Sequence, residues 1–517
     1  SPVTPDFVNP EAPWPHLDEL TRETAAAGKF LEERLTVYPA YAQDLPRWTH
    51  ADLHERMLEM IDSEGFPRTD EWCPGDPDTP PPNAIMNAII NPPKRVSADV
   101  GEILELASAG TALSEEQIVR LFSARGDDFS AVVQRADQLR RKTCSDSVSF
   151  VVNRNINYTN ICYFKCQFCA FSKGKLSENL RGRPYDLSDE EIQRRTVEAW
   201  ERGATEVCMQ GGIHPEYTGD TYAHIVEVVK QAVPEMHVHA FSPLEVWQGA
   251  ATLDLGLGEY LQKLKDAGLN TLPGTAAEIL DDEVRAIICA DKINTQQWLD
   301  VMQAAHDIGF KTTATIMYGH VEKPQHWARH LMRVRALQEQ TGGFTEFVPL
   351  PFVHMEAPMY LKGKARKGPT FREAILMHSV ARLALHGQIE NIQTSWVKMG
   401  HEGVKGCLNA GCNDLGGTLM NESISRAAGT LHGEETSPQQ MNQIIRTMNR
   451  NPRQRATNYS GVNQERIAAG LRQIDLVQIV NTPAKKYERK RPSAELIRNE
   501  PLATEPEAAR PSGTSGA

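Results

Sequence analysis

Short apolar segments alternate with segments of helical periodicity across the middle of the chain, between residues 146 and 460. Strands that are separated by helices indicate repeated β-α units around a parallel sheet. The candidate strands lie at 148–153, 206–210, 236–241, 269–272, 312–317, 346–350, 389–393 and 406–415. Because eight such units can be counted, the pattern predicts an α/β fold, a closed (β/α)8 barrel of the TIM type.

The segments outside this region have other patterns. Residues 96–145 carry apolar positions at helical spacing, which predicts an N-terminal extension of two or three amphipathic helices. Residues 61–95 are rich in proline, glycine and aspartate, the composition of a linker. Residues 1–60 combine a proline-rich start with one helical stretch and are interpreted as the end of another domain. Residues 461–517 predict one helix and then, after about residue 484, a disordered tail with little to bury.

Composition narrows the class of protein. Lysine and arginine number 55 against 67 aspartate and glutamate, a formal net charge of −12, so no excess positive field is available to attract nucleic acid. The mean hydropathy is −0.44 and no apolar run reaches the ~18–20 residues that span a bilayer, so no membrane partner is expected. Three of the nine cysteines lie within eight positions, which favours a metal site in a reducing, cytoplasmic compartment over a disulfide framework.

These three cysteines, Cys162, Cys166 and Cys169, directly follow the first candidate strand. Loops after barrel strands form the catalytic face of such a barrel. The spacing lets three thiolates reach three corners of a cubane [4Fe-4S] cluster and leaves the fourth iron open to a substrate group. A structural zinc ion is the alternative, but it needs a fourth ligand, and the next cysteine in sequence, Cys208, is distant and expected in the core.

The same cysteine spacing is that of radical S-adenosylmethionine (SAM) enzymes. Five further motifs resemble the tyrosine-transferring half of the FO synthase family: NRNINYTN at 153–160, MQGGIHP at 209–215, HAFSPLE at 239–245, YGH at 318–320 and NDLGGT at 413–418. The resemblance covers roughly residues 96–460. Residues 1 to about 45 resemble the end of the ring-closing half, so the chain resembles the C-terminal piece of a fused, two-barrel enzyme.

The resemblance implies a specific reaction. The cofactors would be a [4Fe-4S] cluster and SAM, and a radical would transfer the 4-hydroxybenzyl group of L-tyrosine to 5-amino-6-(D-ribitylamino)uracil, with release of 2-iminoacetate. An electron donor protein and the ring-closing barrel would be partners. One alternative is another radical SAM reaction, such as that of aminofutalosine synthase. The other, from a different class, is a non-catalytic iron-sulfur electron carrier.

Five positions are candidates for contact with the cofactor. Gly211 and Gly212 could let the backbone approach the methionine end of SAM, although a tight turn would need the same residues. Ser242 and Glu245 could bind the ribose or amino group of SAM, although they also form a capping box before a helix. Phe168 lies within the cysteine motif and is assigned to the same cofactor.

Histidines at strand ends are candidates for proton transfer, and these are His214, His239 and His320. Of these, His320 is predicted to be catalytic together with Tyr318, whereas a structural role is the alternative for each histidine.

Three arginines, Arg154, Arg181 and Arg183, could bind the tyrosine carboxylate with a bidentate guanidinium, and a solvated surface position is the alternative for each. Cys407 and Cys412 are too few for a second cluster and are expected to be buried in the core.

Overall fold

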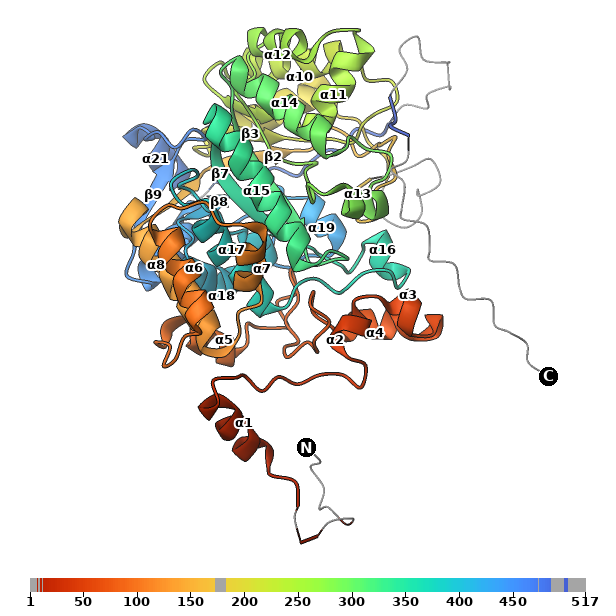
Figure 1. Cartoon of the computed structure of the whole chain (residues 1–517). Helices are drawn as coiled ribbons and strands as arrows, with labels where there is room; N and C mark the ends of the chain where they lie inside the picture. The colour runs from red at the N-terminus through yellow and green to blue at the C-terminus, as the bar shows by residue number, and fades with distance from the viewer. Residues whose placement is uncertain are drawn as a thin grey trace, which may run out of the picture.

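Parallel strands form the centre of the molecule and helices surround them (Figure 1). The computed structural model describes residues 13–172, 183–472, 474–484 and 497–500, together with positions 7, 10 and 11. Six strands pair in the order β2-β3-β4-β5-β6-β7, all parallel. They are β2 (Asn153–Ile156), β3 (Glu206–Met209), β4 (His237–Ala240), β5 (Thr271–Leu272), β6 (Lys311–Tyr318) and β7 (Phe344–Pro351).

A second sheet and three single bridges close this arrangement into a barrel. The strand β1 (Ser147–Val151) leads directly into β2 and pairs with β8 (Asp414–Gly417) on one side and β9 (Asn451–Arg455) on the other. Parallel bridges join Phe347 to Ile392, Gln393 to Asp414, and Arg154 to Met420. The circuit therefore runs from β7 through residues 392 and 393 to β8 and back to the first strand, which confirms the predicted barrel.

The last two barrel strands differ from the prediction. The expected strand at 389–393 is reduced to the bridges at Ile392 and Gln393. The expected strand at 406–415 is wrong for its first part, because helix α18 (Trp396–Leu408) continues to Leu408 and β8 begins only at Asp414. The reason is that a short apolar run is equally compatible with a buried helix end and with a strand.

Helices follow the strands in the order that a barrel requires. After the cysteine-containing loop come α9 (Asp189–Glu201), α10 (Gly219–Ala232), α11 (Pro243–Thr252), α12 (Leu257–Asp266), α13 (Asp282–Ile288), α14 (Thr295–Asp307), α15 (Pro324–Thr341), α16 (Pro358–Leu361) and α17 (Phe371–Ala384). Every residue of α17 is buried. This is possible because the N-terminal extension covers the outer side of that helix.

The extension consists of three helices, as its periodicity predicts. They are α6 (Ala98–Ser108), α7 (Glu115–Phe122) and α8 (Gly126–Cys144), and all three contact α17 (Figure 1). The segment before them differs from the linker that its composition predicts. Trp72 is buried against Phe371 with ring centroids 5.2 Å apart, and Arg68 donates to the Gly368 carbonyl at 2.7 Å. Helix α5 (Asn83–Ile90) packs on α8, so residues 61–95 are part of the folded body.

The remaining terminal elements are short. Helix α1 (Leu17–Ala26) has no buried residue and lies apart from the barrel (Figure 1). Helices α2 (Pro39–Ala42), α3 (Leu45–Trp48) and α4 (His54–Met60), with a 3-10 turn at Ala51–Leu53, share a small separate core. Helices α19 (Ile424–Ala428) and α20 (Pro438–Thr447) precede α21 (Gln464–Gly470), the helix expected near the C-terminus.

The predicted tail is described in part. Residues 485–496 and 501–517 lie outside the described residues, whereas 474–484 and 497–500 contact the barrel. No helix in the described ranges is both long and apolar enough to cross a membrane.

A buried ionic group closes the end of the barrel at which the strands begin. Arg455 lies 2.6 Å from Asp414 and 3.2 Å from Glu346, and Tyr459 donates to Glu346 at 2.8 Å. Thr457 donates to Glu206 at 2.6 Å. Burial raises the pKa of Glu346 to about 7, and the neighbouring Arg455 opposes that rise. Because this end is filled, the opposite end of the barrel is left for chemistry.

We expect Arg455→Met to destabilise the fold by about 3–5 kcal/mol, because Asp414 and Glu346 would be left buried without their counter-charge. Ionisation of a carboxyl whose folded-state pKa is raised opposes folding, so the loss should increase as the pH rises above the unfolded pKa of Glu346. Urea unfolding at two pH values measures both effects. Arg446→Ala, at an exposed position of α20, is the matched control. A loss of under about 1 kcal/mol would contradict the assignment.

Candidate active site

The cysteine loop, residues 158–172, begins where β2 ends and is held from two sides. Gly212 donates its N–H to the Thr159 carbonyl at 2.9 Å, and Tyr163 donates to the Ile213 carbonyl at 2.8 Å. On the other side, Gln167 donates to the Ile288 carbonyl at 2.9 Å. The loop is therefore fixed between the end of β3 and the end of α13.

Cys162, Cys166 and Cys169 are half-buried on this loop. Burial raises the pKa of all three thiols, and the ammonium of Lys292 opposes that rise in each case. Backbone N–H groups also point at two of the sulfurs, from Ile213 to Cys162 Sγ and from Ser172 to Cys169 Sγ, both at 3.4 Å. These donors and the positive charge stabilise thiolates, the form that binds iron.

The kind and number of donors bear on which metal group the loop could hold. The loop offers three free thiols, at Cys162, Cys166 and Cys169. A structural zinc ion takes four protein ligands, whereas three thiolates fit three corners of a [4Fe-4S] cluster and leave the fourth iron open. Among the described residues, the close group of three potential ligands is Asp281, Glu283 and His326, which contains no cysteine.

Lys292 is a site residue that the sequence analysis missed. Its side chain is buried, pairs with Glu278 at 2.7 Å and lies 5.5 Å from the centroid of the Phe168 ring. Burial disfavours its charge, but Glu278 and the thiols of Cys166 and Cys289 raise its pKa above the usual value. It lies in an irregular segment between α13 and α14 and belongs to no motif, so no pattern in the sequence indicated it.

The two glycines at the end of β3 are places of close packing. A Cβ added at Gly212 would lie 2.1 Å from the Ile161 carbonyl oxygen and 2.9 Å from the Cβ of Cys162. A Cβ at Gly211 would lie 2.3 Å from the Tyr158 ring. Both glycines are thus needed to seat the cysteine loop on β3, and their contact with SAM stays a prediction.

Ser242 and Glu245 form the capping box of α11. Ser242 donates its backbone N–H to Glu245 Oε2 at 2.6 Å, and Glu245 donates its own to Ser242 Oγ at 3.3 Å. The other carboxylate oxygen of Glu245 accepts from Gly211 N at 3.2 Å and from the Tyr158 hydroxyl. Burial raises the pKa of Glu245, and these hydrogen bonds oppose the rise. Both carboxylate oxygens are thus occupied, as the capping alternative predicts, and Glu245 positions the ends of the neighbouring strands. The contact of Ser242 and Glu245 with SAM stays a prediction.

Tyr318 and His320 have no exposed surface, which is at odds with the predicted catalytic role. Tyr318 faces the helical layer, with its ring centroid 6.0 Å from that of Trp327 in α15. His320 Nδ1 lies 2.8 Å from the buried carboxylate of Glu322. Burial opposes the charge of Glu322, but His320 and Arg366 hold its pKa well below the usual range. We therefore expect both residues to fix the loop after β6 without touching substrate.

The other two histidines have different surroundings. His239 is buried inside the barrel with Nδ1 2.7 Å from Thr271 Oγ1, and burial lowers its pKa. His214 stacks on Tyr217 with ring centroids 4.8 Å apart. A role in proton transfer stays a prediction for both.

Of the three candidate arginines, Arg154 is not available to a substrate. It is fully buried, and its guanidinium donates to Glu198 at 2.6 Å and to the Arg195 carbonyl at 3.0 Å. The side chain of Arg183 is exposed, and Arg181 lies outside the described residues.

Cys407 and Cys412 are fully buried, as expected for core thiols, and burial raises the pKa of both.

Asn153 and Asn155 of β2, and Asn157 just after it, present amides to which the motif at 153–160 gave no individual role. Asn153, Asn155 and Asn157 follow at every second position, the period that places side chains on one face of a strand. Asn155 donates to Glu422, and Asn157 donates to the Gln210 carbonyl at 3.1 Å. Asn155 Oδ1 is buried and has no hydrogen-bond partner among the described residues. A polar ligand in the barrel would satisfy that oxygen.

We expect Gly212→Ala to abolish iron binding, because the new methyl group collides with the backbone that carries Cys162 and the overpacking costs about 1–3 kcal/mol. Iron and sulfide content after anaerobic reconstitution measures this. The matched control is Gly258→Ala, at an exposed position of α12 where a Cβ meets nothing within 4 Å. Wild-type iron content in the Gly212 variant would disprove the close approach.

Family models match two consecutive regions of the chain. Residues 156–334 match the model described as "Radical SAM superfamily", and residues 341–466 match the one described as "CofH/MqnC C-terminal region". Among solved structures, methylornithine synthase has a TM-score of 0.54 at 17% identity and covers 71% of this chain and 100% of its own. HydG, a maturase of the [FeFe]-hydrogenase, has a TM-score of 0.55 at 14% identity, covering 75% of this chain and 83% of its own. At such identities the likeness bears on the fold alone.

Curated relatives are more similar in sequence. "FO synthase" from Nocardia farcinica (strain IFM 10152) is 43% identical over 511 residues, which is 90% of this chain and 59% of the relative. The chain therefore spans less than two thirds of the length of that relative. "5-amino-6-(D-ribitylamino)uracil--L-tyrosine 4-hydroxyphenyl transferase" from Methanopyrus kandleri (strain AV19) is 44% identical over 370 residues, which is 72% of this chain and 98% of the relative.

Proposed function

Because the chain belongs to the radical SAM family that includes FO synthase and the tyrosine 4-hydroxyphenyl transferase, we propose that it transfers the 4-hydroxybenzyl group of L-tyrosine. The acceptor is 5-amino-6-(D-ribitylamino)uracil and the second product is 2-iminoacetate. The transferase relative is named for these two substrates and is covered over 98% of its length.

The observation that carries this proposal is the cysteine loop at the open end of the barrel. Its three thiols, at Cys162, Cys166 and Cys169, share one short loop, and the ammonium of Lys292 opposes the rise in their pKa that burial causes. A [4Fe-4S] cluster together with SAM supplies a carbon-centred radical that can remove a hydrogen atom from a substrate. Cys162, Cys166 and Cys169 would hold that cluster.

The other residues bind, orient and exclude water. Glu245 fixes the ends of neighbouring strands around the cysteine loop, and the Arg455 group closes the far end of the barrel. Between them, Asn155, His239 and Glu422 offer buried hydrogen-bonding groups that suit a substrate with amino, carbonyl and hydroxyl groups. Exclusion of water protects a reactive radical from side reactions.

The C-terminal region is described as common to two families, so a second reaction has to be tested. An aminofutalosine synthase reaction on the same scaffold would not depend on tyrosine. An iron-sulfur electron carrier would not cleave SAM. SAM cleavage, measured with and without tyrosine, therefore distinguishes the proposal from both alternatives.

We expect Cys162→Ala, Cys166→Ala and Cys169→Ala each to abolish cluster binding and SAM cleavage, because a cluster that has lost one of three protein ligands is labile. Cys407→Ala is the matched control, since this thiol is buried beside α17 and should leave both properties intact. Iron content and deoxyadenosine formation measure the outcome. A brown, SAM-cleaving loop variant would show that the cluster is misplaced.

The substrate assignment is tested in an anaerobic assay with reductant, SAM, tyrosine and the diaminouracil. Deoxyadenosine should form only when tyrosine is present, and the adduct should not fluoresce, because ring closure to the deazaflavin is expected to need the second barrel of the longer relatives. Fluorescence should appear once a ring-closing partner is added. Equal deoxyadenosine formation with and without tyrosine would rule out tyrosine as the substrate. Fluorescence from this chain alone would rule out the expectation that ring closure needs a second barrel.

A further inference from the structure

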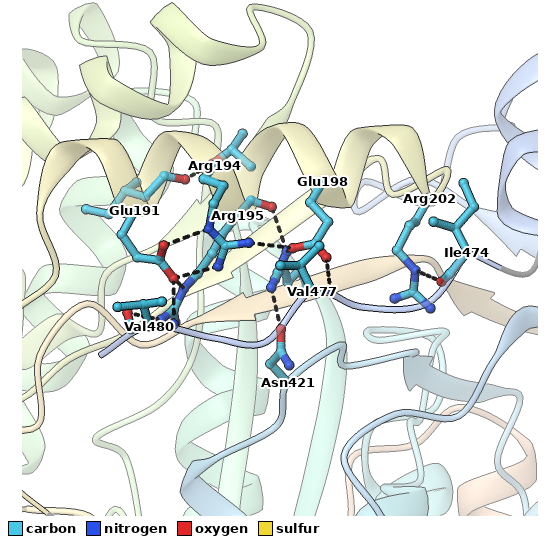
Figure 2. Close-up of polar contacts among 12 residues, drawn as sticks. Glu191, Arg194, Arg195, Glu198, Arg202, Asn421, Ile474, Val477 and Val480 are labelled. Atoms are coloured by element: carbon cyan, nitrogen blue, oxygen red, sulfur yellow. Dashed lines mark hydrogen bonds and ion pairs between the residues drawn. The ribbon is translucent and has the colours of Figure 1, made fainter. Parts of the chain in front are cut away.

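The C-terminal segment runs along helix α9 as an extended strap, residues 474–484. Figure 2 shows charged side chains of α9, and of Arg202 directly after it, bonded to the backbone of this strap. Arg202 donates to the Ile474 carbonyl at 2.8 Å, and Val480 donates its N–H to Glu191 at 3.2 Å. The backbone of the strap thus bonds to side chains along one helix, where an edge strand would bond to the backbone of another strand.

The end of the strap reaches a segment that itself holds the cysteine loop. The backbone N–H of Asp186 donates to the Thr482 carbonyl at 3.1 Å, and Tyr185 forms an antiparallel bridge with Pro483. Tyr185 also donates its N–H to Asn160 Oδ1 at 2.9 Å, two residues before the first cysteine. The strap therefore supports the N-terminal side of the cysteine loop through residues 183–187.

Residues 497–500 contact the outer side of the same region. Ile497 exchanges two hydrogen bonds with the side-chain amide of Gln248 in α11. Asn499 donates to the Lys292 carbonyl at 2.7 Å and to Gln297 Oε1 at 2.6 Å. Lys292 is the residue whose ammonium faces the cysteines, so Asn499 fixes the backbone that carries it.

Arg498 joins two loops of the site. Its guanidinium donates to the Tyr163 carbonyl, lies 4.0 Å from the centroid of the Tyr163 ring and pairs with Asp291 at 3.1 Å. Tyr163 directly follows Cys162, and its own N–H is bound from the inner side by Ile213. Arg498 and Ile213 therefore hold the two consecutive peptide units on either side of the Tyr163 Cα.

We propose that residues 497–500 clamp the cysteine loop onto the barrel and that Arg498 is a positioning residue for the cluster ligands. The inference rests on the proposed function, because it assumes that the loop holds the cluster. Three consecutive residues bind three parts of the chain that surround the cysteines: α11, the cysteine loop and the segment at 291–292. An irregular loop gains order when its outer face is bound, and a more ordered loop releases a cluster less readily.

The test uses the full chain with Arg498→Ala, and two readouts. An iron chelator removes the cluster, and the visible absorbance of the cluster falls as it does so. This loss should be about tenfold faster in the variant, because one charge-assisted contact of ~1.4 kcal/mol is missing. In the cluster-free protein, hydrogen exchange of residues 158–172 should also become faster. The midpoint of thermal unfolding should not move, because the clamp lies outside the core.

Further variants make the test specific. Arg498→Lys keeps the positive charge beside Asp291 but loses the planar guanidinium that bonds to two groups at once. Its cluster lifetime should therefore lie between those of Arg498→Ala and wild type. Asn499→Ala should act in the same direction as Arg498→Ala, and Arg446→Ala, at an exposed arginine of α20, should match wild type. Wild-type chelation and exchange rates in both Arg498→Ala and Asn499→Ala would overturn the proposal, as would a uniform fall in unfolding temperature. If wild type binds no iron, the proposed function fails, while hydrogen exchange still decides the clamp.

Discussion

The structure depends on one buried carboxylate, that of Glu245. It accepts hydrogen bonds from the backbone at Gly211, from the cap of α11 at Ser242 and from the hydroxyl of Tyr158. These donors come from the ends of three neighbouring strands. Because an unpaired buried acceptor is costly, each strand end is held at the place where the others need it. The cysteine loop begins at one of these ends, so its geometry follows from the same carboxylate.

Much of the fold could be read from the sequence because periodicity and strand order act over many residues. The triplet at Cys162, Cys166 and Cys169 was found because the three residues share one short loop. The face of a strand from which a given side chain projects was harder to predict. Tyr318 lies at a strand end, but its side chain turns to the helical layer, and the sequence places a residue along a strand better than on one of its faces.

The missed residues share a different cause. Lys292 and Arg498 lie in irregular segments, and each acts through contacts with residues that are far away in the sequence. Neither segment has a periodicity that could point to a partner. The linker prediction was wrong for a related reason, because Trp72 and Arg68 lie among prolines and glycines and their packing on α17 and the loop before it is set by tertiary structure.

The ionic group at the closed end of the barrel has a consequence for the order in which the chain can fold. Asp414 and Glu346 belong to barrel strands. The arginine that neutralises them, Arg455, lies in β9, which comes late in the sequence of the domain and pairs with its first strand, β1. During synthesis the ribosome releases every barrel strand before this arginine. Until β9 has been synthesised, the end of the barrel that carries Asp414 and Glu346 must therefore stay open to water. Closure of that end is a late event that pairs a strand from the end of the domain's sequence with one from its beginning.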